Sequence, residues 1–311
     1  MDALVLLRSH AYNAHVSKAF GALRSFTRQS KTMLLLDVTN GDVSSDVPTL
    51  KFSGERLRRI GLELYPAGQW AWFAGDYALY CAFLDRPEHS HYVMIDYDAK
   101  VNFWIDEFLE RIGSGDWDLV APYAGFERPD WMWSAAGRHW FDRVAGCFFP
   151  IVVVSRRLLL RCLEHRLAHA RAIPIEAAAR QEFLRQRWMN CEAFVPSVAL
   201  AERYSMADIQ QFVPGWSYSY MRDVDVLHWD MPQLAAIPCA HPVFLKEDLP
   251  EQISKRLRNL PQGELRQWVV KRAGELRGSD SALWEAIQAA NPELRDVSQA
   301  RSPELTLSHG A

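Results

Sequence analysis

The sequence has no closely spaced pair of cysteines, and this absence argues against two common kinds of site. Its five cysteines are scattered over 311 residues, without any CxxC pair. Free thiols in a reducing compartment fit this odd, dispersed set better than a disulfide framework does. A zinc site made of thiolates is not expected, because no two cysteines fall at ligand spacing. The five are Cys81, Cys147, Cys162, Cys191 and Cys239.

Long apolar runs and a strong excess of charge are also missing. No apolar stretch reaches the roughly 18 residues that would span a bilayer. The N-terminal MDALVLLRSH lacks the basic start and the small-residue cleavage site of a secretory signal, so we expect a cytoplasmic protein. The net charge of −3 gives no reason to expect nucleic acid as a partner.

Aromatic residues are abundant, at 12% of the chain, and twelve of them are tryptophan. Saccharide sites often use aromatic faces, but large cores use the same rings, and we expect most of them in the core. The apolar content of 49% and charged content of 23% are ordinary for a globular protein. The length permits one large domain or two modest ones.

Short apolar segments alternate with helical patterns over the first 122 residues. Because these strands read as apolar throughout, they predict a mostly parallel sheet covered by helices on both faces. Such a sheet places ligands beyond the carboxyl ends of its strands. The expected strands are Ala3–Leu7, Thr32–Leu36, Thr49–Phe52, His91–Ile95 and Asp118–Pro122. The expected helices are Ala14–Ser25, Trp70–Leu84 and Trp104–Arg111.

The pattern changes after Pro122, which divides the chain into predicted parts. We expect a nucleotide-binding half over 1–122 and an acceptor half over 123–246, which together form one domain. A helical extension over 247–296 and a polar, disordered tail over 297–311 would follow. The helices of the extension could serve oligomerisation or peripheral docking at the inner face of a membrane, although amphipathic helices more often pack on their own domain.

The most informative stretch is the apolar strand Tyr92–Ile95, which ends in Asp96-Tyr97-Asp98. Two carboxylates one residue apart repel each other at the end of a buried strand, and a divalent cation would offset that repulsion. Mg²⁺ and Mn²⁺ prefer oxygen ligands and often bridge carboxylates and substrate phosphates. The alternative is a polar turn, because D-x-D also arises by chance.

Asp96-Tyr97-Asp98 resembles the DxD motif of GT-A glycosyltransferases. The upstream segment from Trp70 to Tyr80 is similar to the W-x-x-GD-x-x-LY helix of bacterial glycosyltransferase-like sequences, and the likeness covers about residues 1 to 245. It implies a GT-A-like mixed, mostly parallel sheet flanked by helices, with a C-terminal helical extension. It also implies that Asp98 ligates Mn²⁺ or Mg²⁺ directly, while Asp96 contacts the donor or reaches the metal through water. The first strand lacks the small-residue turn usual in the family.

Two later residues are candidates for the same site. His241, in the context Cys239-Ala240-His241-Pro242-Val243, matches the late histidine that completes the metal sphere in many GT-A enzymes; His228 is the substitute. Glu192 resembles the catalytic base of inverting members, in which a carboxylate takes the proton of the acceptor hydroxyl. A surface glutamate at a helix end is the alternative to this role. The competing carboxylates are Asp223 and Asp225.

Further candidates concern the donor and the acceptor. Asp37 could accept hydrogen bonds from a nucleobase or ribose, and His10 follows the first strand at the same edge of the sheet. Asp76 could bind the nucleotide or cap a helix, and Gly75 would allow close approach. The loop tryptophans Trp131, Trp133 and Trp216 are candidates for stacking on the acceptor. Arg156-Arg157 could bind phosphate, although a solvated helix face is the more common role.

These residues predict transfer of a sugar from a nucleoside diphosphate sugar to a hydroxyl of a glycan or other acceptor, in bacterial surface glycan synthesis. A metal-dependent nucleotidyltransferase is one alternative, but no Gly-rich basic phosphate loop is evident. A non-catalytic carbohydrate-binding or assembly protein is another. The sugar, the nucleotide and the stereochemical outcome stay open.

Overall fold

The computed structural model describes residues 1–127, 131–215, 217–218, 227–259, 263 and 280–292. The chain forms two compact units. The first contains Met1–Ser217 and Ala235–His241, and the second contains Tyr218–Leu234 and Pro242–Ala311. All of the described candidate site residues except His228 belong to the first unit.

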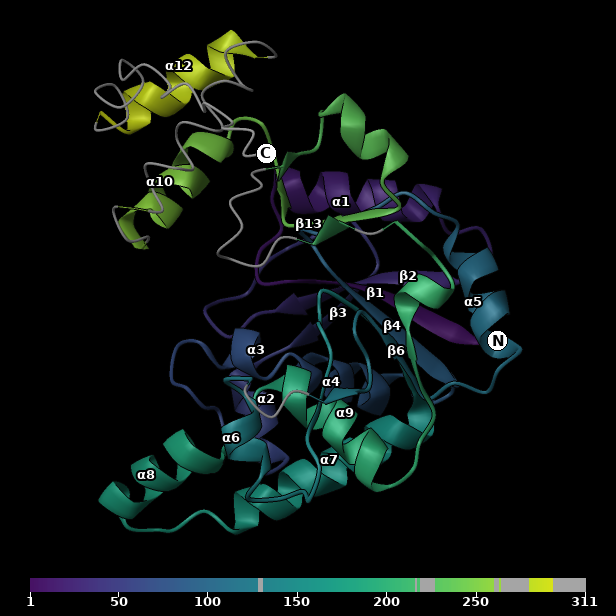
Figure 1. Ribbon diagram of the computed structural model, residues 1–311, viewed down its shortest axis with the longest axis vertical. Coiled ribbons are helices and arrows are strands. Elements are labelled where there is room, and N and C mark those ends of the chain that lie inside the picture. The colour runs from purple at the N-terminus through teal and green to yellow at the C-terminus, as the bar shows by residue number, and fades with distance from the viewer. Residues whose placement is uncertain (128–130, 216, 219–226, 260–262, 264–279, 293–311) are drawn as a thin grey trace, which may run out of the picture. The chain divides into compact units, whose positions relative to one another are not determined.

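A seven-stranded sheet in the order β10-β6-β9-β4-β1-β2-β3 organises the first unit (Figure 1). Neighbours are parallel except around β9, which is antiparallel to both β4 and β6. The expectation of a mixed, mostly parallel sheet is therefore confirmed. The strands are β1 (Ala3–Ser9), β2 (Lys31–Asp37), β3 (Thr49–Phe52), β4 (His91–Asp96), β6 (Leu119–Ala121), β9 (Ile151–Ser155) and β10 (Met206–Asp208).

Helices cover both faces of this sheet, with α1 and α5 on one side and α4, α7 and α9 on the other (Figure 1). The strand interiors are buried, which explains why they read as continuous apolar runs. The helices of this unit are α1 (Ala14–Ser25), α2 (Gly54–Arg59), α3 (Trp70–Phe73), α4 (Asp76–Asp85), α5 (Ile105–Gly113), α6 (Ser134–Gly137), α7 (Arg156–Arg171), α8 (Ala177–Arg187) and α9 (Cys191–Ala201). The 3-10 turn η1 covers Ile209–Gln211.

One expected helix is two in the structure. The segment predicted as a single helix over Trp70–Leu84 is interrupted after α3, where Ala74 has φ −115° and ψ 58°. Gly75 then precedes α4 as its N-cap. Apolar periodicity continues through the break, because both short helices bury their apolar side chains in the same core, so periodicity alone did not show it.

Short strands complete the first unit. β5 (Lys100–Val101) pairs antiparallel with β13 (Cys239–His241), and β7 (Phe126–Glu127) pairs antiparallel with β8 (Ala145–Gly146). β11 (Ser217–Tyr218) lies at the boundary between the units. The pairing of β5 with β13 returns the chain to the loop that follows β4.

Among its described residues, the second unit has two short parallel strands and two helices. β12 (Leu227–His228) pairs with β14 (Val243–Phe244), and α10 (Leu249–Asn259) contacts α12 (Ser281–Ala290). The 3-10 helix η2 (Pro232–Ala236) spans a junction of the units. Both helices fall within the predicted extension, whereas the tail over 297–311 lies outside the described residues. None of the described helices is long and apolar enough to cross a membrane.

Candidate functional site

A tight turn after β4 brings the two aspartates of the DxD motif to one point. The backbone N–H of Asp96 donates to Pro150 at 2.8 Å, and that of Ala99 donates back to the Asp96 carbonyl at 2.9 Å. The ligand atoms of Asp96, Asp98 and His241 all lie within 4.8 Å of one another. Two carboxylates and an imidazole form a donor set that suits Mn²⁺ and, less well, Mg²⁺.

His241 reaches this turn through strand pairing. The register of β13 against β5 places Cys239 opposite Val101 and Ala240 opposite Lys100. His241 therefore follows on beside the end of the turn, and its Nε2 lies 3.5 Å from Oδ1 of Asp98. The ring also packs against Phe148, with 5.5 Å between ring centroids. His228, the substitute candidate, is a buried residue of the second unit.

The partner of Asp96 is Arg8, which was not among the residues predicted from the sequence. The register of β1 against β4 places Arg8 opposite Asp96. The guanidinium donates to both carboxylate oxygens, from Nε at 2.7 Å and from Nη2 at 2.8 Å. This is the bidentate geometry in which arginine pairs most strongly with a carboxylate. The apolar strand that ends in arginine was a signal, but only the strand order shows which strand end it faces.

The absence of a side chain at Gly75 leaves room for the Arg8 guanidinium. A Cβ at Gly75 would lie 2.3 Å from Nη1 of Arg8, a distance at which something must move. Nη1 also lies 3.5 Å from the carbonyl of Ala71, to which it donates. The W-x-x-GD segment is therefore connected through Arg8 to the cluster of Asp96, Asp98 and His241. Close approach at Gly75, which the sequence suggested, serves an arginine of the chain itself.

The pKa values of the two aspartates are shifted in opposite directions. Burial raises the pKa of Asp96, and the repulsion of Asp98 adds to that rise, so the Arg8 guanidinium only partly offsets it. Burial also raises the pKa of Asp98, but the positive charge of protonated His241 and hydrogen bonds outweigh this and leave the pKa below its usual range. Asp98 is thus the more readily ionised carboxylate, as a metal ligand must be.

Glu192 lies in the first turn of α9, near the cluster. The side chain of Asn190 caps this helix and accepts a hydrogen bond from the Glu192 N–H at 2.7 Å. The backbone N–H of Phe149 donates to Glu192 Oε1 at 3.4 Å. Burial raises the pKa of Glu192 to about 7, and the charge of Asp96 contributes to the rise. A carboxyl group with this pKa is matched to general base work near neutral pH.

His10 and Asp37 lie at the same edge of the sheet as the cluster. His10 is exposed and contacts Tyr97, the residue between the two aspartates, edge to face at 5.7 Å. Asp37 ends β2, and its Oδ1 accepts hydrogen bonds from the N–H and the hydroxyl of Thr39. Both residues remain candidates for donor contacts.

Asp76 occupies a different environment from the one expected. It is fully buried, and its carboxylate receives Nε and Nη2 of Arg166 at 2.9 and 3.0 Å. The hydroxyl of Tyr80 donates to Oδ2 at 2.7 Å. Neither oxygen faces solvent, so this arrangement favours a core ion pair over the predicted nucleotide contact. An acidic residue next to a long apolar run was the available signal.

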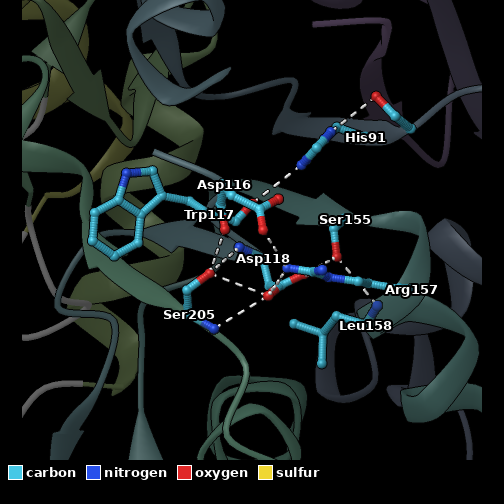
Figure 2. Close-up of polar contacts among 9 residues, drawn as sticks. His91, Asp116, Trp117, Asp118, Ser155, Arg157, Leu158 and Ser205 are labelled. Carbon is cyan, nitrogen blue, oxygen red and sulfur yellow. Dashed lines mark hydrogen bonds and ion pairs between the residues drawn. The ribbon is translucent and has the colours of Figure 1, made fainter. Parts of the chain in front are cut away.

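Arg157, the second arginine of the Arg156-Arg157 pair, forms an ion pair with Asp118 (Figure 2). Arg157 donates to both oxygens of Asp118, from Nε at 2.5 Å and from Nη2 at 2.8 Å. Ser155 and Ser205 also donate to this buried aspartate. The network joins β6, β9 and the chain entering β10, so it has a structural role rather than the suggested phosphate contact.

Two of the three tryptophans predicted to stack on the acceptor are described by the structure. Trp131 and Trp133 are half-buried next to α6, and Trp133 contacts both Phe73 and Trp72 edge to face. Trp216, Asp223 and Asp225 lie outside the described residues.

Comparison with solved structures finds glycosyltransferases among the similar chains. One is mouse xyloside xylosyltransferase 1 in its apo form, with 12% identity and a TM-score of 0.39, covering 77% of this chain and 96% of that one. Another is a glycosyltransferase involved in the glycosylation of the major capsid of PBCV-1, with 9% identity and a TM-score of 0.38, covering 78% and 92%. A197 from STIV matches with 15% identity and a TM-score of 0.27, covering 52% and 68%.

No protein-family model and no curated protein matches the chain. Structural similarities of this size do not assign an activity, so the functional argument depends on the site.

Proposed function

We propose that the protein is a divalent-metal-dependent glycosyltransferase of the GT-A type that uses a nucleoside diphosphate sugar. The observation that carries the proposal is the cluster of Asp96, Asp98 and His241 at the carboxyl end of β4. This position is where an open α/β sheet binds its ligands. Glu192, with its pKa near 7, adds a base to the same region.

Each residue has a distinct part in the proposed chemistry. Asp98 and His241 would hold Mn²⁺ or Mg²⁺, with Asp96 beside them, and the ion would offset the charge of the departing nucleoside diphosphate. Arg8 keeps Asp96 in place. Glu192 would take the proton of the acceptor hydroxyl as its oxygen bonds to the anomeric carbon, which describes an inverting reaction. The bacterial surface glycan suggested by the sequence resemblance remains the proposed destination.

Calorimetric titration of nucleoside diphosphates, with and without Mn²⁺, tests the donor site. We expect one nucleotide to bind in a metal-dependent manner to the wild type, and Asp98→Asn to abolish that binding. Asp42→Asn is the matched control, because it makes the same change at an exposed aspartate that pairs with Lys51 on the surface. Unchanged nucleotide binding by Asp98→Asn would contradict the metal site.

Analysis of the reaction products separates the alternatives. Incubation with a nucleotide sugar and acceptor should release nucleoside diphosphate and form a glycoside. Release of pyrophosphate from a nucleoside triphosphate and a sugar phosphate would instead indicate a nucleotidyltransferase. Saccharide binding without any turnover, unaffected by Asp98→Asn, would indicate a binding protein.

A further inference from the structure

An aromatic cavity of about 510 Å³ lies between α3, α6 and the chain that joins α8 to α9. Its walls include the rings of Tyr65, Phe73, Trp133 and Trp188. Pockets of this size hold ligands as large as a drug molecule, and mostly apolar walls with few polar groups are typical of them. All of these residues belong to the first unit.

Two residues of the cavity lining lie next to Glu192. Trp133 lines the cavity, and its side chain is close enough to the Glu192 carboxyl group to lower the pKa of that group. Asn190 lines the cavity as well, and its side chain accepts from the backbone N–H of Glu192 at 2.7 Å. The helix turn that carries Glu192 is therefore capped by a residue of the cavity wall. A molecule lying against Trp133 would be next to the proposed base.

The walls favour a neutral molecule that has apolar ring faces. Trp133 meets Phe73 with 5.5 Å between centroids and Trp72 with 6.0 Å, so three rings from two segments form one aromatic group. Trp72 is 56% exposed and Met132, which lines the cavity, is 72% exposed. Large apolar side chains exposed together often mark a ligand-binding surface.

The charge at the rim argues against an anionic ligand. Arg185 lines the cavity, but its Nη2 lies 2.9 and 2.7 Å from the two carboxylate oxygens of Glu182. His139 and Gln186, two further polar residues of the lining, are exposed and can donate or accept without bringing a fixed charge. Hydroxyl groups are natural partners for such a rim.

We propose that this cavity is the acceptor site and that it binds a neutral glycoside, with the apolar face of its pyranose ring against Trp133 and Phe73. This inference rests on the proposed function. In the reaction, the acceptor oxygen bonds to the anomeric carbon of the donor, and the bond from that carbon to the diphosphate oxygen breaks. The acceptor proton passes to Glu192, and the bonding pair leaves with the nucleoside diphosphate.

Ligand-observed NMR with p-nitrophenyl glycosides and methyl glycosides of common neutral pyranoses tests the site in the full-length protein. The measurements use EDTA and no donor, so that they report the cavity alone. We expect saturation transfer to the pyranose C–H protons of at least one glycoside. p-Nitrophenyl phosphate, the anionic comparator, should show none. A panel without any binder, or binding of the phosphate alone, would overturn the proposal.

Two variants locate the binding without removing a ring. Ala135 is exposed and lines the cavity, so Ala135→Trp should fill it and weaken glycoside binding by about tenfold or more. Met132→Ser removes an exposed apolar contact and should weaken binding less. Asp42→Asn, a substitution at an exposed aspartate, should leave binding within about twofold of the wild type. Equal binding by Ala135→Trp and the wild type would place the glycoside elsewhere.

The acceptor site and the transferase function can be rejected independently of each other. Metal-dependent nucleotide binding without glycoside binding in the cavity would reject the acceptor site and leave the donor site standing. Glycoside binding in the cavity without any nucleotide binding would reject the transferase and leave a saccharide-binding protein.

Discussion

Replacement of Arg8 by methionine tests how the cluster balances its charges. The side chains of Arg8 and Asp96 are 16% and 17% exposed, and two hydrogen bonds join them. Loss of one partner from a buried ion pair costs about 3–5 kcal/mol. Because water screens this pair in part, we expect Arg8→Met to lower the free energy of unfolding by about 2–4 kcal/mol. The melting midpoint would fall on the order of 10 °C.

Mn²⁺ should return much of that stability. Without Arg8 the two carboxylates have a formal charge of −2, and a bound divalent cation no longer has a neighbouring positive charge. At a separation of ~6 Å and an effective dielectric near 20, the repulsion between the guanidinium and a divalent cation is about 5–6 kcal/mol. The variant should therefore bind Mn²⁺ more tightly than the wild type, and a ligand that binds only the folded state raises its stability.

The assay is urea unfolding in EDTA and in saturating Mn²⁺. The difference between Arg8→Met and the wild type should shrink when the metal is present. Arg59→Met is the control, because Arg59 forms an exposed pair with Glu55 and should change stability little under either condition. Equal stabilisation of the wild type and Arg8→Met by Mn²⁺ would show that Asp96 does not face a bound metal. It would contradict the proposed balance of charge between Arg8 and the metal.

Three further predictions follow from neighbouring contacts. Gly75→Ala should displace the Arg8 guanidinium and lower stability in urea unfolding, and its effect should be less than additive with Arg8→Met. Because the raised pKa of Glu192 is about 7 and a base acts when ionised, turnover should rise with pH through about 7, and Glu192→Gln should abolish that rise and most of the activity. Asp76→Ala should cost about 3–5 kcal/mol, since it leaves Arg166 buried and unpaired, while nucleotide affinity per folded molecule, measured by calorimetry, stays unchanged. Weaker nucleotide binding with unchanged stability would instead support the nucleotide contact first expected for Asp76.

The sequence was sufficient to predict the edge of the sheet that carries the cluster. A strand can be recognised from the run of apolar residues within it. Tyr92–Ile95 reads as a buried strand, and a parallel sheet gathers the carboxyl ends of its strands. The structure has this strand as β4, with Asp96 at its end. The helix over Trp70–Leu84 was wrong at one point, since the break before Gly75 leaves apolar periodicity intact.

The partners of the acidic residues could not be predicted in the same way, because they depend on long-range pairing. Arg8 faces Asp96 only because β1 lies next to β4 in the sheet. Arg166 reaches Asp76 from 90 residues away in the sequence, and both are fully buried. Composition and spacing show that a buried charge needs a partner, but not which residue supplies it.

The arrangement of Arg8 also bears on how the two aspartates divide their work. Arg8 uses both oxygens of Asp96, whereas Asp98 lies beside His241, whose imidazole is neutral when it ligates a metal. Asp98 is therefore the carboxylate better placed for direct ligation, and Asp96, held by arginine, would act through its remaining lone pairs or through water. With neutral His241, the formal charges of Asp96, Asp98 and Arg8 sum to −1, so a bound divalent cation would make the site +1. A net positive site attracts a donor diphosphate, whereas the same two carboxylates without Arg8 would only neutralise the ion. Under the proposed function, the arginine at the end of β1 would therefore contribute to the attraction for the donor as well as to stability.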